Sequence, residues 1–194
     1  MTSYYKENQN GRSMVEMLGV LAIIGVLSVG GISGYSKAMA KFKLTKAQDQ
    51  ISMLLMNIRT AFATSPNYSG LNNTTAISYN IAPGDMVPGT AEEGKINHAF
   101  GGAVTVKEAD SDGNPKDDGG QYFYIQLTQL GREACVSLAS SDWGTDGLVY
   151  MQVNNYSAHQ AASLPLTPMK AGGGSSTRGC DAKGSYNTIK WLYY

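Results

Sequence analysis

The chain has 194 residues, which is enough for one ordinary domain with an appendage. Its 15 acidic residues balance its 15 basic residues, so we expect no broad positive field that would attract nucleic acid. With 23 glycines and only 4 phenylalanines, the composition favours a small, loop-rich body over a large enzyme core.

An uncharged apolar run dominates the N-terminal part of the chain. The polar residues 1–11, MTSYYKENQNG, precede it and are interpreted as a leader. The run extends from Met17 to Ser36, and a helix of about 20 residues, rising about 1.5 Å per residue, spans a bilayer. Glu16 stands at the edge of the run, where a carboxylate is costly if it enters lipid. We therefore treat Glu16 as a candidate functional residue.

The apolar pattern becomes amphipathic after Lys37. Apolar residues recur at helical spacing from Leu44 to Phe62, with charged residues between them. Because no proline occurs before Pro66, we predict one continuous helix from about residue 13 to about residue 64. Its weak point, where we expect a bend or local melting, is a group of glycines that each cost about 1 kcal/mol relative to Ala: Gly30, Gly31 and Gly34.

The rest of the chain predicts a small antiparallel sheet. Residues 66–100 are dense in Asn, Gly, Thr and Pro and are interpreted as a connecting segment. Strand-like runs rich in Val, Ile and Tyr follow at Ala103–Val106, Tyr122–Leu127, Leu148–Val153 and Thr188–Tyr194. A short helix is expected between the second and third runs. The predicted fold class is α+β, with the amphipathic half of the long N-terminal helix packed against the sheet.

Two cysteines, Cys135 and Cys180, lie far from the apolar run. Cys135 falls in the predicted short helix, and a flexible glycine-rich loop, Gly172–Gly179, leads to Cys180. The pair is compatible with one disulfide or with two unpaired thiols. A membrane-targeted N-terminus favours the disulfide, because it favours an oxidising compartment.

The physical properties of the N-terminus leave two interpretations open. A Sec signal peptide could be cut after the A-x-A match at Ala38–Ala40, leaving Lys41 as the first residue. A single-span anchor is the alternative. The lysines that follow the span then favour a cytoplasmic C-terminal body, whereas a disulfide favours the opposite side of the membrane.

A third interpretation comes from resemblance. The stretch GRSMVEMLGVLAIIGVLS, Gly11 to Ser28, resembles the class III signal sequence of type IV pilins and of their pseudopilin relatives. In that family a prepilin peptidase cuts directly after a glycine, and a glutamate is the fifth residue beyond the cut. The resemblance implies cleavage between Gly11 and Arg12, methylation of the new amine of Arg12, and an assembly role for Glu16. Arg12 departs from the family pattern, because the first mature residue is usually apolar. The non-Phe first residue and the mature length lean towards the type IVb branch, and the short leader leans away from it.

The resemblance also implies a domain organisation. Residues 1–11 would be the prepilin leader, 12–37 the transmembrane and filament-core helix, 38–65 the amphipathic half of that helix, and 66–194 a globular head. In the head, Cys135 and Cys180 would form a disulfide that bounds a C-terminal loop.

The implied function is that of a structural subunit of a type IV pilus, a homo-oligomeric helical filament that serves adhesion or motility. The implied partners are the prepilin peptidase, the inner membrane and the pilus assembly machinery, with a surface receptor as a further candidate. The subunit would wait in the inner membrane and then join the extracellular pilus. A pseudopilin of a type II secretion system is the alternative within the family, and a Sec-secreted or membrane-anchored binding protein is the alternative outside it.

Two roles for Glu16 are considered within this resemblance. It could meet the N-terminal amine of Arg12 of a neighbouring subunit, or it could lie at the lipid headgroup level, where it is wet. Arg12 and Glu16 are also spaced i, i+4, so they could pair within one chain for about 0.2–0.5 kcal/mol in water.

The remaining candidate chemistry is weak. The stretch DSDGNPKDDGG, Asp110–Gly120, begins like a calcium loop but lacks the glutamate at the twelfth position and contains a proline, so an exposed turn is preferred. His98 and His159 are isolated and are predicted to lie at the surface. Met53 and Met56 are interpreted as core or interface filler. We expect neither an enzyme nor a cofactor, metal or specific nucleic-acid partner.

Overall fold

The computed structural model describes residues 14–144, 146–154, 156–158, 171, 179–180 and 187–194. The chain divides into two compact units, Met1–Phe42 and Lys43–Tyr194. Gly11, Arg12 and His159 lie outside the described residues, as does nearly all of the loop expected at Gly172–Gly179.

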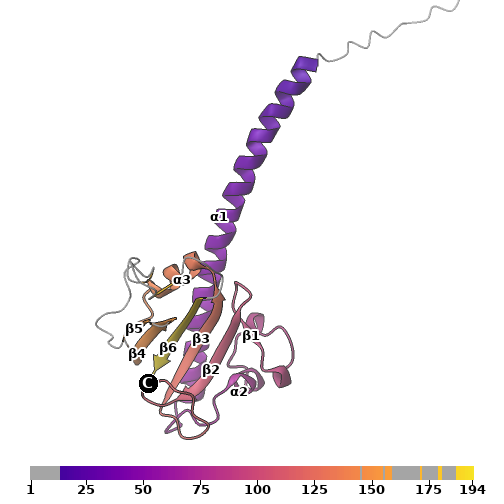
Figure 1. The fold of residues 1–194 in the computed structure, drawn as a ribbon. Helices are drawn as coiled ribbons and strands as arrows, with labels where there is room; N and C mark the ends of the chain where they lie inside the picture. Colours follow the sequence, from indigo (N-terminus) through magenta and orange to yellow (C-terminus); the bar gives the residue numbers. More distant parts are fainter. Residues whose placement is uncertain (1–13, 145, 155, 159–170, 172–178, 181–186) are drawn as a thin grey trace, which may run out of the picture. The chain divides into compact units, whose positions relative to one another are not determined.

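Helix α1, Met14–Ala61, begins in the first unit and ends in the second (Figure 1). The prediction of one continuous helix is confirmed, with bounds slightly inside those expected. The helix stays α-helical through Gly30, Gly31 and Gly34, so the expected local melting does not occur there. Glycine, unlike proline, keeps its backbone N–H and can therefore make the helical hydrogen bond. Each glycine destabilises the helix by about 1 kcal/mol relative to Ala but does not interrupt it.

The part of α1 that belongs to the second unit buries one face. Its buried residues are spaced three or four apart, as an amphipathic helix requires: Ala47, Gln50, Ile51, Leu54 and Ile58. Gln50 is the polar member of this face. Its amide Nε2 donates to Asp85 Oδ2 at 2.8 Å, and its Oε1 accepts from the backbone N–H of Ala99 at 3.0 Å. The helix is thereby tied to two loops of the same unit.

A six-stranded antiparallel sheet forms the other layer of the second unit, with the strand order β1-β2-β3-β6-β4-β5. The strands are β1 (Ile96–Asn97), β2 (Ala103–Ala109), β3 (Tyr122–Leu130), β4 (Leu148–Val153), β5 (Tyr156–Ala158) and β6 (Asn187–Tyr193). The last strand in the sequence therefore lies in the middle of the sheet, between β3 and β4. The four predicted strands are confirmed, whereas β1 and β5 were missed because they are too short to show a period of two.

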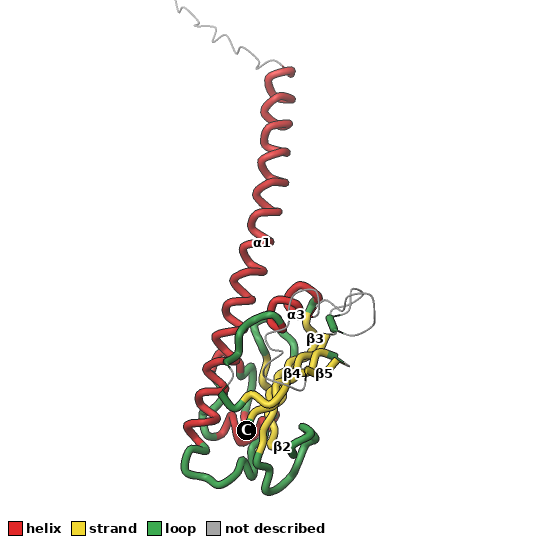
Figure 2. Tube along the Cα trace, turned by 90° about the vertical axis from the view of Figure 1, so that its left-hand side faces the viewer, coloured by secondary structure: helices red, strands yellow, loops and turns green. Residues whose placement is uncertain are grey.

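One face of the sheet packs against α1, and the main core lies between them. Figure 2 shows the helix on one side of the strands. The core joins Ile51, Leu54 and Ile58 of α1 to sheet residues that include Phe123 and Trp191. A smaller cluster covers the opposite face of the sheet and comprises Ala109, Tyr124, Tyr150 and Leu192. The predicted α+β fold, with a sheet on the amphipathic half of the helix, is confirmed.

The segment from residue 66 to residue 100 is more structured than expected. It contains helix α2 (Asn73–Ser78), the 3-10 turns η1 (Gly84–Met86) and η2 (Ala91–Glu93), and strand β1. The side chain of Asn73 donates to the Val104 carbonyl at 2.9 Å and accepts from the Val106 N–H at 2.7 Å. Asn73 thereby satisfies backbone groups on the side of β2 where β1 pairs only with Ala103 and Val104. The rest of that edge would otherwise be open to pairing with another chain.

Candidate functional site

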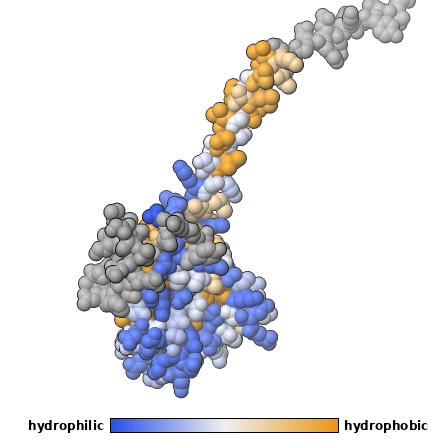
Figure 3. Space-filling model, viewed as in Figure 1, coloured by the Kyte–Doolittle hydropathy of each residue, from blue (hydrophilic) through white to orange (hydrophobic). Residues whose placement is uncertain are grey.

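The described part of the first unit is an uncovered apolar helix. From Met14 to Tyr35, its large apolar side chains are between 52% and 85% exposed, the upper value being that of Met14. By length and composition alone, α1 could cross a membrane. In Figure 3 the side chains along this part of α1 are mainly hydrophobic, whereas the visible surface of the second unit is mainly hydrophilic. A continuous apolar surface of this kind must be covered by lipid or by other protein chains.

Glu16 lies in the first turn of α1 and is exposed. A carboxylate is favoured there by the partial positive charge of the helix N-terminus. Because Arg12 lies outside the described residues, its pairing with Glu16 stays a prediction. Two serines in the apolar stretch satisfy their own hydroxyls, since Ser28 donates to the Ile24 carbonyl at 2.7 Å and Ser36 to the Ile32 carbonyl at 3.0 Å. These bonds lower the cost of placing the serines in a dry environment.

Within the described part of the chain, no contact requires the glycines of the apolar stretch. A Cβ atom added at any of them would meet no heavy atom within 4 Å: Gly19, Gly25, Gly30, Gly31 and Gly34. In an apolar environment, small residues allow a second helix to approach closely. The glycines therefore leave space that none of the described residues fills.

The predicted disulfide is present between Cys135 and Cys180, whose Cα atoms are 5.9 Å apart. Cys135 lies on helix α3 (Arg132–Ala139), and both cysteines are buried. The backbone N–H of Cys180 donates to the Ala171 carbonyl at 2.7 Å. The disulfide ties α3 to the chain shortly before the central strand β6. Within the loop that the disulfide closes, residues 145, 155, 159–170 and 172–178 lie outside the described residues.

The acidic turn at Asp110–Gly120 uses its first carboxylate to hold its own backbone. Asp110 Oδ1 accepts from the N–H groups of Asp112, at 3.0 Å, and Asn114, at 2.8 Å. Hydrogen bonds, chiefly from the Asn114 side chain, hold the pKa of Asp110 below its usual value. The Tyr150 hydroxyl donates to the Asp112 carbonyl at 2.8 Å. Among the described residues, no group of three or more His, Cys, Asp or Glu side chains is placed to hold a metal ion.

A buried carboxylate, Glu108, lies beside this turn and is only 2% exposed. Its Oε1 accepts from the Gly70 N–H and its Oε2 accepts from the Gly120 N–H, both at 2.9 Å. Glu108 therefore joins the segment that follows α1 to the end of the acidic turn.

His98 is not a surface residue, and that prediction was wrong. It is 3% exposed, its Nε2 lies 2.8 Å from the Thr128 carbonyl oxygen, and its Nδ1 accepts from the Phe100 N–H at 3.2 Å. These partners fit a neutral imidazole with its proton on Nε2. Burial lowers the pKa of His98, and the Thr128 carbonyl partly opposes that effect. The chain folds back here through a bond from the His98 N–H to the Gly102 carbonyl, a turn that isolated histidines in a sequence do not reveal.

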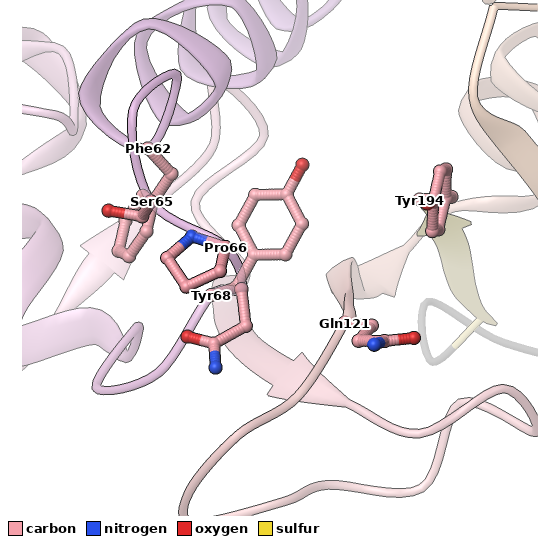
Figure 4. Close-up of a pocket in the computed structure, with 7 residues that line it drawn as sticks. Phe62, Ser65, Pro66, Tyr68, Gln121 and Tyr194 are labelled. Carbon is pink, nitrogen blue, oxygen red and sulfur yellow. The ribbon is translucent and has the colours of Figure 1, made fainter.

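A cleft of about 220 Å³ lies beside the C-terminal end of α1, within the second unit (Figure 4). Its lining is uncharged and consists of Phe62, Ser65, Pro66, Asn67, Tyr68, Gln121 and Tyr194. The ring centroid of Tyr68 lies 5.4 Å from that of Phe62 and 4.5 Å from that of Phe123. Burial raises the pKa of Tyr68, the positive charge of Arg59 opposes that rise, and negative charge on Tyr194 adds to it.

Comparisons with known proteins place this geometry in a family. The chain is 29% identical over 176 residues to the major structural subunits of bundle-forming pilus from Escherichia coli O111:H- and from Escherichia coli O127:H6 (strain E2348/69 / EPEC), covering 86% of this chain and 87% of each relative. The crystal structure of a type IV b pilin from Salmonella typhi shares the fold, with a TM-score of 0.54 and 21% identity, over 79% of this chain and 98% of that one. Residues 42–192 match the family described as PilS N terminal. The chain belongs to the PilS family of type IV pilins.

In this pilin, Met53 and Met56 are 54% and 66% exposed, so they do not belong to the core of the second unit. Their interpretation as interface filler stays a prediction. The sequence does contain a signal for their exposure, because they fall beside the stripe that Ile51, Leu54 and Ile58 define.

The cleft of the pilin was missed by sequence reasoning. Its aromatic walls come from the chain that follows α1 and from the residue that follows β6, while Gln121 directly precedes β3. The only sequence signal was the presence of 12 tyrosines, which does not tell which of them meet.

Proposed function

We propose that this pilin is a structural subunit of a type IV pilus, held in the inner membrane by residues 12–37 and then packed through the same helix into an extracellular filament. The proposal rests on the apolar half of α1, whose large side chains are uncovered in the single chain. The relatives that match most of the chain are named as major structural subunits of a pilus, which favours a pilus over a secretion pseudopilin or a secreted binding protein.

The exchange from lipid to filament fits the side chains of this helix. Both environments are dry, so the apolar side chains lose little hydrophobic free energy on transfer. Ser28 and Ser36 bond to their own helix and need no partner from outside. The glycines leave open space in which neighbouring helices of the filament could pack closely.

We further propose that prepilin peptidase removes residues 1–11, cutting between Gly11 and Arg12, and that the new amine of Arg12 is methylated. Glu16 would then meet this amine on a neighbouring subunit. A charge at the bilayer centre costs about 2.5–3.5 kcal/mol, and an unpaired carboxylate is costly in the dry filament core for the same reason. The favoured alignment of neighbouring helices would therefore be the one that places Glu16 against the Arg12 amine of the next subunit. Before assembly, the guanidinium of Arg12 would partly neutralise Glu16 in the membrane.

The test is to express the wild type, Glu16→Ala and a control, Asp49→Ala, which removes an exposed carboxylate of the same helix outside the apolar run. We expect mass spectrometry of the mature protein to find a methylated Arg12. Glu16→Ala should be processed and inserted but give no filaments by electron microscopy and no pilin in the sheared fraction, while the control should assemble. An N-terminus at Met1 or Lys41, or normal filaments from Glu16→Ala, would overturn the proposal.

A separate variant tests the role proposed for the guanidinium. Arg12→Ala should give fewer filaments or lower subunit levels, because Glu16 then enters the membrane without a compensating charge. Normal filaments together with normal subunit levels would exclude that role and leave the rest of the proposed function intact.

A further inference from the structure

The cleft beside the end of α1 has no part in the proposed assembly. Figure 4 shows Tyr68 and Tyr194 on either side of an open space, with the Gln121 side chain beneath it. Within the described part of the chain, the Gln121 amide and the hydroxyls of Tyr68 and Tyr194 make no hydrogen bond. Asn67 makes one side-chain hydrogen bond among the described residues, in which its Oδ1 accepts from the Ser69 N–H at 3.2 Å. Several donors and acceptors therefore converge on one space without a protein partner.

The aromatic walls of the cleft are held in place by neighbouring rings. Tyr68 packs between Phe62 and Phe123. Tyr194 is 66% exposed, and its ring lies 5.5 Å from that of Tyr122 in a tilted contact. A ligand that entered the cleft would meet rings that are already oriented, and this lowers the entropy cost of binding.

The chemistry of the lining selects the kind of ligand. No lining side chain is charged, and Arg59, whose positive charge acts on Tyr68, is not part of the lining. The lining side chains therefore offer a phosphate, carboxylate or ammonium group no ion pair. Flat apolar walls combined with amide and hydroxyl groups suit a molecule with a C–H face and a rim of hydroxyls. The volume of about 220 Å³ is below the roughly 300–1,000 Å³ of drug-sized sites, so it suits one ring rather than an extended chain.

We propose that this cleft binds one neutral hexopyranose unit of a surface glycan. The C–H face of the sugar lies against Tyr194, its opposite side lies towards Tyr68, and its hydroxyls bond to the amides of Gln121 and Asn67. The site is complete within one chain, so it does not depend on filament assembly. A failure of sugar binding is therefore distinguishable from a failure of the proposed pilus function.

The experiment uses the full chain in micelles of a detergent without a sugar headgroup. Methyl glycosides of glucose, galactose and mannose are offered singly, and saturation-transfer NMR measures transfer from aromatic protons to the sugar C–H protons. We expect transfer to at least one of the three. Tyr194→Ala and Gln121→Ala should each weaken its binding about tenfold, since each removes one stacking face or one hydrogen-bonding group. Both residues are exposed, so neither substitution removes a side chain from the core. Gln121→Ala provides the second variant if Tyr194→Ala disturbs the end of β6.

Tyr79→Ala is the matched control, because Tyr79 is 74% exposed and does not line the cleft. It should leave sugar affinity unchanged, and glucuronic acid should bind no tighter than methyl glucoside. The proposal is overturned by the absence of transfer from all three glycosides at about 10 mM, where millimolar affinity would be visible. The proposal is also overturned if the two cleft variants bind the sugar as tightly as the wild type, or if Tyr79→Ala loses as much sugar affinity as they do. Binding of a proline-rich peptide in place of every sugar would overturn it too.

Discussion

Removal of the disulfide should lower the free energy of unfolding of the second unit by about 4 kcal/mol. Cys135 and Cys180 are separated by 45 residues in sequence. On the chain-entropy model, a closed loop of that length removes about 13 cal/mol/K from the unfolded chain, or about 4 kcal/mol at 25 °C. The double variant Cys135→Ala/Cys180→Ala is preferred to serine substitutions, because both positions are buried and a buried hydroxyl would need a partner.

The assay is urea unfolding of the full chain followed by tryptophan fluorescence. Both tryptophans of the chain, Trp143 and Trp191, belong to the second unit, and their ring centroids lie 4.9 Å apart. With a urea dependence of about 1–3 kcal/mol/M, the loss should lower the midpoint by roughly 1.3–4 M. Dithiothreitol should shift the wild type in the same direction and leave the double variant unchanged.

A loss of less than about 1 kcal/mol at an unchanged urea dependence would refute this reasoning. It would mean that the unfolded chain already keeps the two positions close, so that the bond restricts it little. A shift in the double variant on adding dithiothreitol would show that the reductant acts on something other than this bond.

Three further predictions concern stability in the same assay. Burial lowers the pKa of His98 below its unfolded value of about 6.5, so the unfolded chain binds the proton more readily than the folded chain. The stabilising contribution of the neutral imidazole is therefore fully present above about pH 6.5. The free energy of unfolding should fall as the pH drops from there towards the folded pKa. His98→Gln should remove that fall, and an unchanged pH dependence would contradict the assignment. Glu108→Gln turns one carboxylate oxygen into a donor facing a backbone N–H and should cost about 1–3 kcal/mol; a neutral result would count against the two bonds. Gly113→Ala should cost more than Gly119→Ala, because both glycines have positive φ but only at Gly113 would the new Cβ overlap the Tyr150 hydroxyl; equal losses would leave backbone strain as the only cause.

The elements predicted well are those whose signal is local. The long helix follows from an uninterrupted apolar and then amphipathic pattern without proline, and β4 has the bounds expected for it, Leu148–Val153. The turns and helices between residues 66 and 100 were read only as a connecting segment. Their order comes from contacts with distant residues, such as the bonds from the Asn73 side chain to β2, which no local pattern contains.

What the sequence did not reveal about His98 and the disulfide has one physical cause, namely contacts between distant parts of the chain. A single histidine has the same local signature in a loop and in a core, so only the turn that places His98 against Thr128 decides its burial. The disulfide was favoured from the sequence because a membrane-targeted segment precedes two cysteines, but the sequence does not show that α3 lies next to the chain before β6.

By itself, the sequence determined the apolar helix with Glu16 at its edge, the amphipathic continuation of that helix and the α+β class, because periodicity and hydrophobicity act over a few neighbouring residues. Only the tertiary structure decided that the last strand lies in the middle of the sheet, that Glu108 and His98 are buried and paired, and that Tyr68, Gln121 and Tyr194 line one cleft. Those outcomes depend on contacts between residues far apart in the chain, which form only when the sheet closes on the helix.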